Sequence, residues 1–593
     1  MWHLRRGEFS LAEQFLRRSI ERFTLRNPNP YDGEPFYSLG LTLRYLGRDE
    51  EAFAGFYKST WNYAWRSAGY LALAEVDVAR GAFENALEHL NLCLRTNADH
   101  LNARNLSVVA LRKLGRSFEA ETVLAETLAL DPLDYWARHL AGRTLGNNQA
   151  RLDVAIDLLR SGLHIEAKSL LETADLSARD GSVPMILYVL GHTSSLLGDA
   201  VHAKAMYREA AAASPDYCLP SRLEELIVLE AALQCNPHDP SAHYYVGNWL
   251  FDRRRHEEAI IHWEHSAALD PSYSVVWRNL GMAYFNVRSD AAKARSSFER
   301  AVQANPKDAR LRYERDQLWK RIGVSAPNRL TELQTSLDLV SQRDDLIIEL
   351  ADLYNQTGQP CSAAALFHNR RFQPWEGGEG AVLAQYVRTQ LALGRKALEE
   401  GDPKRACALM EAVLHPPENL GEAWHLLTNR SNVYYWLGIA CEALDDHTSA
   451  RAWWTKAAGS SGDFQQMSLR PYSEITYYSA GALKLLGRPA EARQLLRALL
   501  RYAKHLSSME PRIDYFATSL PAMLLFSDDL AKRNSITAVF LEAQAAIALG
   551  YSRRGHRLLN RVLQHDLSHA KASELIGELR TETALAERAA IRA

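Results

Sequence analysis

The sequence has little of what marks a disulfide-stabilised, membrane-spanning or nucleic-acid-binding protein. Its 593 residues include six cysteines that lie far apart with no CxxC pair, so neither a zinc knuckle nor a dense disulfide framework is expected. No stretch approaches the about 18 consecutive apolar residues of a membrane span. The charges nearly cancel, with 69 Lys and Arg against 71 Asp and Glu, so electrostatics favour neither a nucleic-acid nor an anionic-membrane partner.

The opening residues also lack an apolar run. Basic residues within Met1–Glu8 are not followed by the hydrophobic core of a secretion signal. We therefore expect a soluble, cytoplasmic chain.

What the sequence does contain is a repeated pattern. One unit matches the tetratricopeptide (TPR) pattern W-x2-L-G-x2-Y…A-x3-F…P, apart from one extra residue between the helices. It is formed by Trp277, Leu280, Gly281, Tyr284, Ala294, Phe298, Ala301 and Pro306. Gly47, Gly81 and Gly115 recur at the TPR period of about 34 residues. Apolar residues follow helical spacing throughout, which leaves no room for strands.

The repeats predict an all-α fold, a right-handed α-solenoid of TPR helix pairs. Breaks in their regularity suggest three blocks, 1–217, 218–343 and 344–593. Gly7, Ala12 and Leu16 resemble a second helix whose first helix is missing, so the chain begins inside a repeat. An uncapped repeat there predicts binding to an upstream domain or to a second copy of the chain.

One histidine-rich helix resembles a metal site until its spacing is checked. His256–His262 lacks the second histidine four residues on that a zincin helix needs. His262 and His265, with Glu258 one turn before, could hold a metal, but polar residues on an outer helix face are the favoured interpretation. No nucleophile stands beside a recognisable base. We expect no metal, no cofactor and no catalytic residue.

Polar residues on first helices are the main binding candidates, because first helices line the concave face of TPR folds. Aligned on their glycines, Asn248 and Asn279 match the asparagines of the clamp that grips a peptide's terminal carboxylate, although Tyr244 replaces the first clamp lysine. The alternative is that they tie adjacent repeats together. The candidate residues are Asn248, Arg278, Asn279, Asn286 and Arg310.

A second candidate site combines two less repetitive strings. Arg343-Asp344-Asp345 precedes a helix, with aspartates placed to cap its free amides. Trp375 is expected to plug a junction between repeats or to stack on a ligand such as a sugar or peptide ring. Glu376 and Glu379 precede the helix that starts near Ala381. We expect them to act as capping groups at its positive end.

Longer strings resemble one family. Tyr244–Asn248, Arg278–Gly281, Gln342–Leu346 and Pro374–Gly380 resemble the TPR region of large bacterial proteins that begin with domain of unknown function 5107 (DUF5107). The resemblance implies that such an array follows a β-rich domain similar to sugar-binding mutarotase-like folds. This sequence lacks that domain, so carbohydrate activity would not transfer to these residues.

Two functions follow from these observations, beside the possibility of a rigid spacer. The leading hypothesis is a non-catalytic TPR scaffold that binds a protein or peptide segment on its concave face. The alternative is an accessory or incomplete part of a bacterial carbohydrate-active protein. That alternative predicts that the residues of the second candidate site converge in one cleft.

Overall fold

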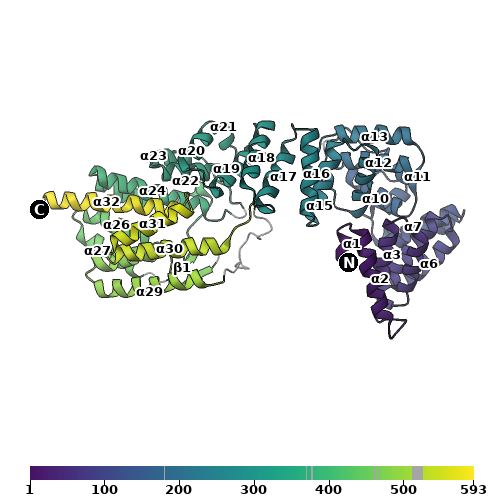
Figure 1. Cartoon of the computed structure of the whole chain (residues 1–593), viewed down its shortest axis with the longest axis horizontal. Helices are drawn as coiled ribbons and strands as arrows, with labels where there is room; N and C mark the ends of the chain where they lie inside the picture. Colours follow the sequence, from purple (N-terminus) through teal and green to yellow (C-terminus); the bar gives the residue numbers. More distant parts are fainter. Residues whose placement is uncertain are drawn as a thin grey trace. The chain divides into compact units, whose positions relative to one another are not determined.

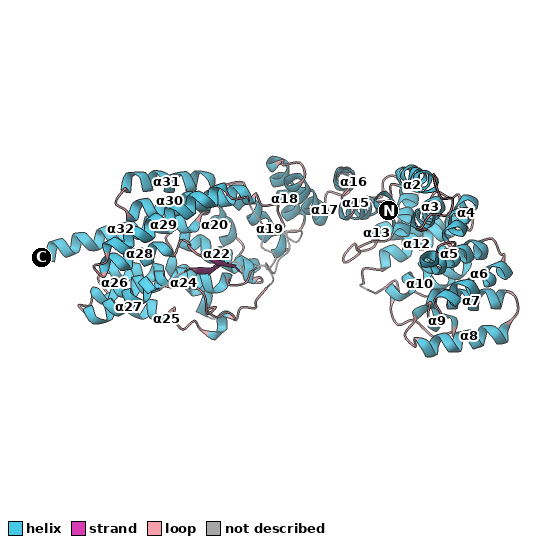
Figure 2. Ribbon diagram, turned by 90° about the horizontal axis from the view of Figure 1, so that it is seen from below, coloured by secondary structure: helices cyan, strands magenta, loops and turns pink. Residues whose placement is uncertain are grey.

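The computed structural model describes the chain except for residues 179, 369, 376–377, 460–461, 466–467, 511–524 and 593, and the side chains of 465, 468 and 588–592. The described chain is built almost entirely from helices, drawn in cyan in Figure 2. Its internal contacts divide it into unit 1, Met1–Leu280, and unit 2, Gly281–Ala593. The three predicted blocks stay a prediction.

Unit 1 consists of short helices joined by turns and loops (Figure 1). They are α1 (Trp2–Arg5), α2 (Phe9–Thr24), α3 (Glu34–Tyr45), α4 (Asp49–Ser59), η1 (Tyr63–Trp65), α5 (Arg66–Ala79), α6 (Phe83–Thr96), α7 (Leu101–Lys113), α8 (Ser117–Leu130), α9 (Tyr135–Leu140), α10 (Asn148–Arg160), α11 (His164–Leu171), α12 (Val183–Leu196), α13 (Ala200–Ala212), α14 (Leu223–Cys235), α15 (Pro240–Asp252) and α16 (His256–Leu269). Helix α17 (Ser274–Asn286) contains the boundary between the units.

Unit 2 continues the same alternation with helices of more varied length. They are α18 (Ala291–Ala304), α19 (Ala309–Arg321), α20 (Ala326–Gln334), α21 (Leu337–Val340), α22 (Asp344–Gln356), α23 (Pro360–His368), α24 (Ala381–Glu400), α25 (Pro403–Ala412), η2 (Glu418–Leu420), α26 (Ser431–Glu442), α27 (His447–Gly459), α28 (Thr476–Leu485), α29 (Pro489–Ser508), α30 (Leu530–Ala548), α31 (Ser552–His565) and α32 (Ala570–Arg592).

Glycines on first helices make room for aromatic rings from second helices. A Cβ atom added at Gly247 would lie 2.5 Å from the indole of Trp263, and one at Gly40 would lie 2.5 Å from the ring of Phe56. Only glycine lets the two helices of a pair approach this closely. These contacts recur along the chain and confirm the predicted all-α solenoid of TPR-type helix pairs.

The evenly spaced glycines have a different role. Gly47, Gly81 and Gly115 end first helices with φ angles of 71°, 74° and 74°, a left-handed conformation that side chains disfavour. The 34-residue spacing seen in the sequence is therefore the spacing of interhelical turns.

The chain opens with a shortened helix where the sequence suggested a missing one. Helix α1 has four residues, and the turn at Gly7 faces Leu226 and Trp249, which would lie 2.8 and 3.2 Å from an added Cβ. Trp2 and Phe15 remain 60% and 55% exposed. Binding through this apolar surface stays a prediction.

A short hairpin corrects the prediction that the chain has no strands. Strands β1 (Asp463–Gln465) and β2 (Ser468–Arg470) pair antiparallel, with Phe464 opposite Leu469. Three-residue strands are too short for a recognisable alternating pattern. The hairpin is held to the start of α26, where Asp463 accepts a hydrogen bond of 3.0 Å from the amide of Asn429.

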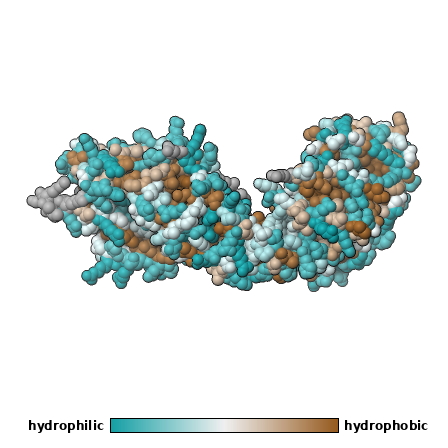
Figure 3. Space-filling view, turned by 90° about the horizontal axis from the view of Figure 1, so that it is seen from above, coloured by the Kyte–Doolittle hydropathy of each residue, from teal (hydrophilic) through white to brown (hydrophobic). Residues whose placement is uncertain are grey.

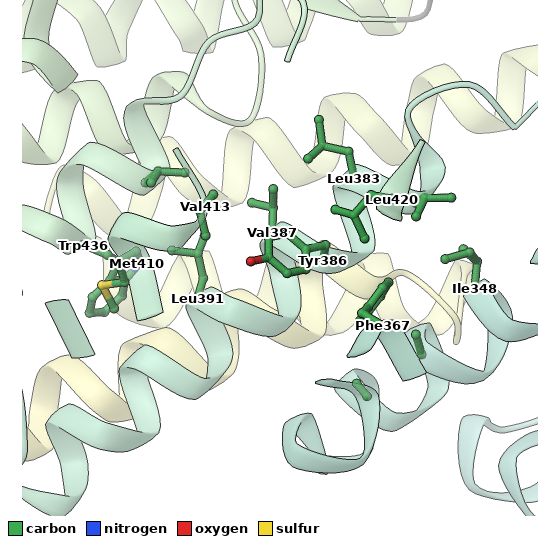
Figure 4. Packing of buried hydrophobic residues seen from close by; sticks show 14 of the residues in the cluster. Ile348, Phe367, Leu383, Tyr386, Val387, Leu391, Met410, Val413, Leu420 and Trp436 are labelled. Carbon is green, nitrogen blue, oxygen red and sulfur yellow. The ribbon is translucent and has the colours of Figure 1, made fainter. Parts of the chain in front are cut away.

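The core of unit 2 runs continuously through successive pairs. Figure 4 shows Val387 and Leu391 along α24, with Met410 of α25 and Trp436 of α26 in the same cluster. The side chain of Trp436 is fully buried. Each such large apolar side chain stabilises the fold by roughly 1.5–3 kcal/mol.

The described helices do not have the character of membrane spans. None of those in the described part of the chain combines the length and apolarity needed to cross a bilayer. On the face shown in Figure 3, apolar groups are interspersed with hydrophilic groups on both units.

Candidate binding surface

Asn248 and Asn279 lie side by side on the first helices of adjacent repeats in unit 1. The Asn279 amide donates to the Asn248 Oδ1 atom at 3.1 Å, and the Trp263 indole donates to the same oxygen at 3.1 Å. Arg278 Nη1 donates to Asn279 Oδ1 at 3.3 Å. This network joins α15, α16 and α17. It is the arrangement that the alternative describes, in which these residues tie adjacent repeats together. Peptide binding by these residues stays a prediction.

The other two residues of the predicted concave site belong to unit 2. Asn286 donates to the carbonyl of Leu525 at 3.1 Å and accepts from the amide of Ser527 at 2.8 Å. Arg310 pairs with Glu314 on α19 at 2.8 Å. The described contacts of Asn286 thus fix a distant segment to α17.

The Arg343-Asp344-Asp345 cluster differs in part from the predicted helix cap. Asp345 pairs with Arg343 at 2.6 Å and accepts from the amide of Leu346 at 2.7 Å. Asp344 instead pairs with Arg370 and accepts from the amide of Gln373 at 2.9 Å. Its carboxylate therefore anchors the segment that leads to Trp375, rather than capping α22.

Trp375 lies half-buried against the core of unit 2, and its role as a junction plug or a stacking platform for a ligand stays a prediction. An added Cβ at Gly378 would overlap its indole at 2.0 Å, so glycine is required there. Glu379 is exposed, and Glu376 lies outside the described residues. The amides of Gly380 and Leu383 at the start of α24 both donate to Glu422 at 2.8 Å. Glu422 makes the amide contacts that were expected of Glu376 and Glu379, and no local sequence signal marks it as the cap.

The histidines of α16 do not simply occupy an outer face. His262 Nδ1 lies 2.9 Å from His243 Nδ1, and His243 Nε2 lies 3.1 Å from the carbonyl of Pro237. Burial, together with His243 and His265, lowers the pKa of His262 to about 4. No group of three or more metal-ligating side chains suited to a metal ion occurs within the described residues.

Helices α3, α10 and α14 of unit 1 also meet through charged residues. Arg160 pairs with Glu224 at 2.8 Å, and the Tyr45 hydroxyl donates to the same carboxylate at 3.1 Å. Burial raises the pKa of Glu224, but the adjacent Arg160 outweighs it, and the net pKa is lowered. The first-helix side of this unit therefore already binds carboxylates from its own chain.

Unit 2 holds a whole helix in this way, through residues that no local sequence pattern connects. Arg388 and Arg395 of α24, Tyr435 of α26 and Tyr478 of α28 all lie on first helices and all bind α32; we call them the Arg–Tyr face. In Figure 1, α32 is the yellow helix that lies beside α24.

The glutamates of α32 supply the carboxylates. Glu574 pairs with Arg388, and Glu578 pairs with Arg395 at 2.9 Å. Glu578 also accepts from the Tyr478 hydroxyl at 2.7 Å, and Glu582 accepts from the Tyr435 hydroxyl at 2.8 Å. Because the glutamates are spaced four residues apart, all three lie along one side of the helix.

Another side of α32 is apolar. Ala572 and Leu575 are buried with Phe540, Leu559 and Val562 of α30 and α31. The helix is thus held by carboxylates on one side and by apolar contacts on the other.

Burial changes the acid–base behaviour of this contact. It raises the pKa of Glu578 to about 7, although Arg395 and Tyr478 act in the opposite direction. Burial likewise raises the pKa of Glu582. At neutral pH the docked helix therefore carries less negative charge than the same helix in water.

A chain of buried ion pairs extends the Arg–Tyr face towards α19. Arg388 also pairs with Asp352, and Lys320 pairs with Glu349 at 3.0 Å. Arg329 has no exposed side-chain surface and pairs with Asp316 at 2.6 Å. Arg388 therefore also binds a carboxylate outside α32, whereas Arg395 pairs with Glu578 of α32.

Comparison with known proteins finds repeat proteins at low similarity. No protein-family model matches the sequence. A TPR protein from Parabacteroides merdae is 17% identical over 49% of this chain and 98% of its own, with a TM-score of 0.22. A structure of Naa15/Naa10 bound to HypK-THB gives 12% identity over 98% of this chain and 89% of that chain, with a TM-score of 0.24.

A third structure is that of YrrB, described as a TPR protein with an unusual peptide-binding site. It is 17% identical over 37% of this chain and 92% of its own, with a TM-score of 0.15. With TM-scores this low, the fold rests on the helix pairs themselves. The resemblance to the DUF5107 proteins stays a prediction.

Proposed function

We propose that the chain is a non-catalytic helical-repeat scaffold that binds a protein or peptide segment on the face formed by its first helices. The observation that carries the proposal is the seating of α32 on the Arg–Tyr face. Two arginines and two tyrosine hydroxyls bind carboxylates there, beside an apolar wall from α30 and α31. Such a surface suits the recognition of an amphipathic helix.

In unit 1 the proposed contacts remain Asn248, Arg278 and Asn279, and in unit 2 they include Asn286 and Arg310. These side chains already make hydrogen bonds within the chain. A peptide that binds them must therefore preserve those bonds or replace them with its own. Arg278 is the best position for a test, since it is half-buried on a first helix beside both asparagines of unit 1.

Site-specific photo-crosslinking tests this placement in the full chain. A photoreactive phenylalanine derivative replaces Arg278 on α17 in one variant and Ile261 on α16, which is 47% exposed, in the control variant. We expect the first variant to form a discrete protein adduct in cells and the second to form none. Equal adducts from both positions, or adducts from Ile261 alone, would contradict the proposal.

One observation favours the alternative, a glycan site in an accessory part of a carbohydrate-active protein. Asp344 bonds to the amide of Gln373 and so places the Arg343–Asp345 cluster next to the segment that precedes Trp375. Titration of tryptophan fluorescence with oligosaccharides tests it, with a Trp375→Phe variant as the control. A saturable change in the wild type that the variant lacks would favour this alternative over a protein-binding scaffold.

A further inference from the structure

We propose that α32 is an exchangeable ligand of its own chain, and that the Arg–Tyr face takes a partner's acidic amphipathic helix in its place. The partner helix would carry carboxylates at positions i, i+4 and i+8. This inference rests on the proposed function and deepens it, because it names the kind of partner and gives α32 a regulatory role.

The spacing of the donors selects the partner. Arg388 and Arg395 lie seven residues apart on α24, while Tyr435 and Tyr478 come from the next two first helices. Together they bind carboxylates on three successive turns of α32. A helix with apolar residues at these positions would leave the Arg395 guanidinium, whose side chain is only 10% exposed, without the oxygen acceptor that Glu578 provides. Burying a charged donor without an acceptor is strongly unfavourable, so the partner helix must carry carboxyl groups at these positions.

The middle of α32 contains a residue, Gly577, that lowers the stability of the helix. Gly577 lies between Leu575 and Leu579 in the interior of α32. Glycine has a lower helix propensity than alanine at such a position. A Cβ atom added there would meet nothing within 4 Å, so no close contact requires a glycine. The sequence therefore lowers the stability of α32 at a position where alanine would fit.

Docking of α32 also has an unfavourable free-energy contribution. Glu578 is buried on docking, and burial opposes its charge at neutral pH. Arg388 retains Asp352 when Glu574 leaves, so release of α32 does not strand that arginine. Because α32 is bound but its helix is weakened, a partner helix needs only a modestly more favourable binding free energy to replace it.

Competition in the full-length protein tests the proposal. The probe is a fluorescently labelled peptide of residues 570–592, and its binding is followed by anisotropy. Gly577→Ala in the protein should strengthen docking of its own α32 and weaken probe binding by about fivefold. A Glu574→Gln/Glu582→Gln protein keeps its Arg–Tyr face but loosens α32, so it should bind the probe at least about tenfold more tightly than wild type.

Two controls define the site. Tyr435→Phe added to the Glu574→Gln/Glu582→Gln protein should weaken probe binding, because the face loses one donor to the probe's own Glu582 while its own α32 is already loosened. A probe with alanine at positions 574, 578 and 582 should not bind the loosened protein.

The outcomes separate this inference from the proposed function. Binding of the probe with equal affinity to the wild type, Gly577→Ala and the double variant would leave the face as a binding surface but would overturn exchange with α32. Failure of the probe to bind even the loosened protein would overturn the exchange and remove the support that the Arg–Tyr face gives to the scaffold proposal. Binding of the alanine probe would overturn recognition of carboxyl groups.

Discussion

At the scale of single residues, a few side chains determine how closely the helices pack. The glycine–aromatic contacts, such as Gly247 with Trp263, set the distance within a pair. Buried carboxylates such as Glu578 determine which protonation state the packed form prefers. Two predictions belong to this scale.

Gly247→Ala should destabilise unit 1. The added Cβ would lie 2.5 Å from the Trp263 indole, and overpacking of this kind costs about 1–3 kcal/mol. Gly146→Ala is the matched control, because nothing lies within 4 Å of the added atom. Urea denaturation followed by circular dichroism measures both. Equal midpoints for the two variants would show that the glycine–aromatic contact does not limit helix approach.

Glu578 should make α32 docking stronger below neutral pH. Its pKa is about 7 when docked and near its ordinary 4.5 when released, so docking favours the protonated form. The gain is complete below about pH 4.5 and is lost as pH rises through about 7; its size is of order 3 kcal/mol. Hydrogen exchange of α32 at several pH values, corrected for intrinsic rates, measures the change.

Other groups titrate near this contact, so a control variant is needed. Glu578 faces Arg395, Tyr478, Glu574 and Glu582. His569 has a pKa lowered by burial, and its protonation opposes docking as the pH falls. The prediction therefore concerns the difference between wild type and Glu578→Gln, which mimics the protonated state. A difference that does not vary between pH 5 and 7.5 would contradict it.

At the scale of elements, helix ends show where sequence reasoning succeeds and fails. The regular spacing of Gly47, Gly81 and Gly115 was visible in the sequence because it recurs from repeat to repeat, and the structure adds that these glycines form the turns between helices. The cap of α24 was not predictable, since Glu422 follows the helix start by about forty residues. The docking of α32 was also missed: Glu578 and Arg395 are 183 residues apart, and no local pattern connects them.

Glu422→Ala should loosen the start of α24. The carboxylate accepts from two amides at the positive end of the helix, a contact worth about 1–2 kcal/mol. Glu379→Ala, at the exposed position that the sequence favoured, should have a smaller effect. Hydrogen exchange in residues 381–388 and thermal melting compare the two variants. A larger effect of Glu379→Ala would contradict this assignment.

At the scale of the whole molecule, each unit uses first helices to bind its own charged side chains. In unit 1, Arg160 and Tyr45 meet at Glu224. In unit 2, four residues of the Arg–Tyr face bind the glutamates of α32. The repeat fold was predictable from sequence. Asn248 and Asn279 are hydrogen-bonded to each other, and peptide binding by them stays a prediction. The binding surface we propose depends on contacts between distant repeats.

Hydrogen exchange of α32 in a Tyr435→Phe/Tyr478→Phe protein tests the central claim most directly. Each variant side chain keeps its ring but loses the hydroxyl that binds a carboxylate, and each such bond contributes about 1.5–3 kcal/mol. Tyr551→Phe, at a 63% exposed tyrosine of the same unit, is the control. We predict at least about tenfold faster exchange in α32 with the rest of unit 2 unchanged. Unchanged exchange in α32, or equal acceleration throughout the unit, would contradict the claim that this face holds α32 as a ligand.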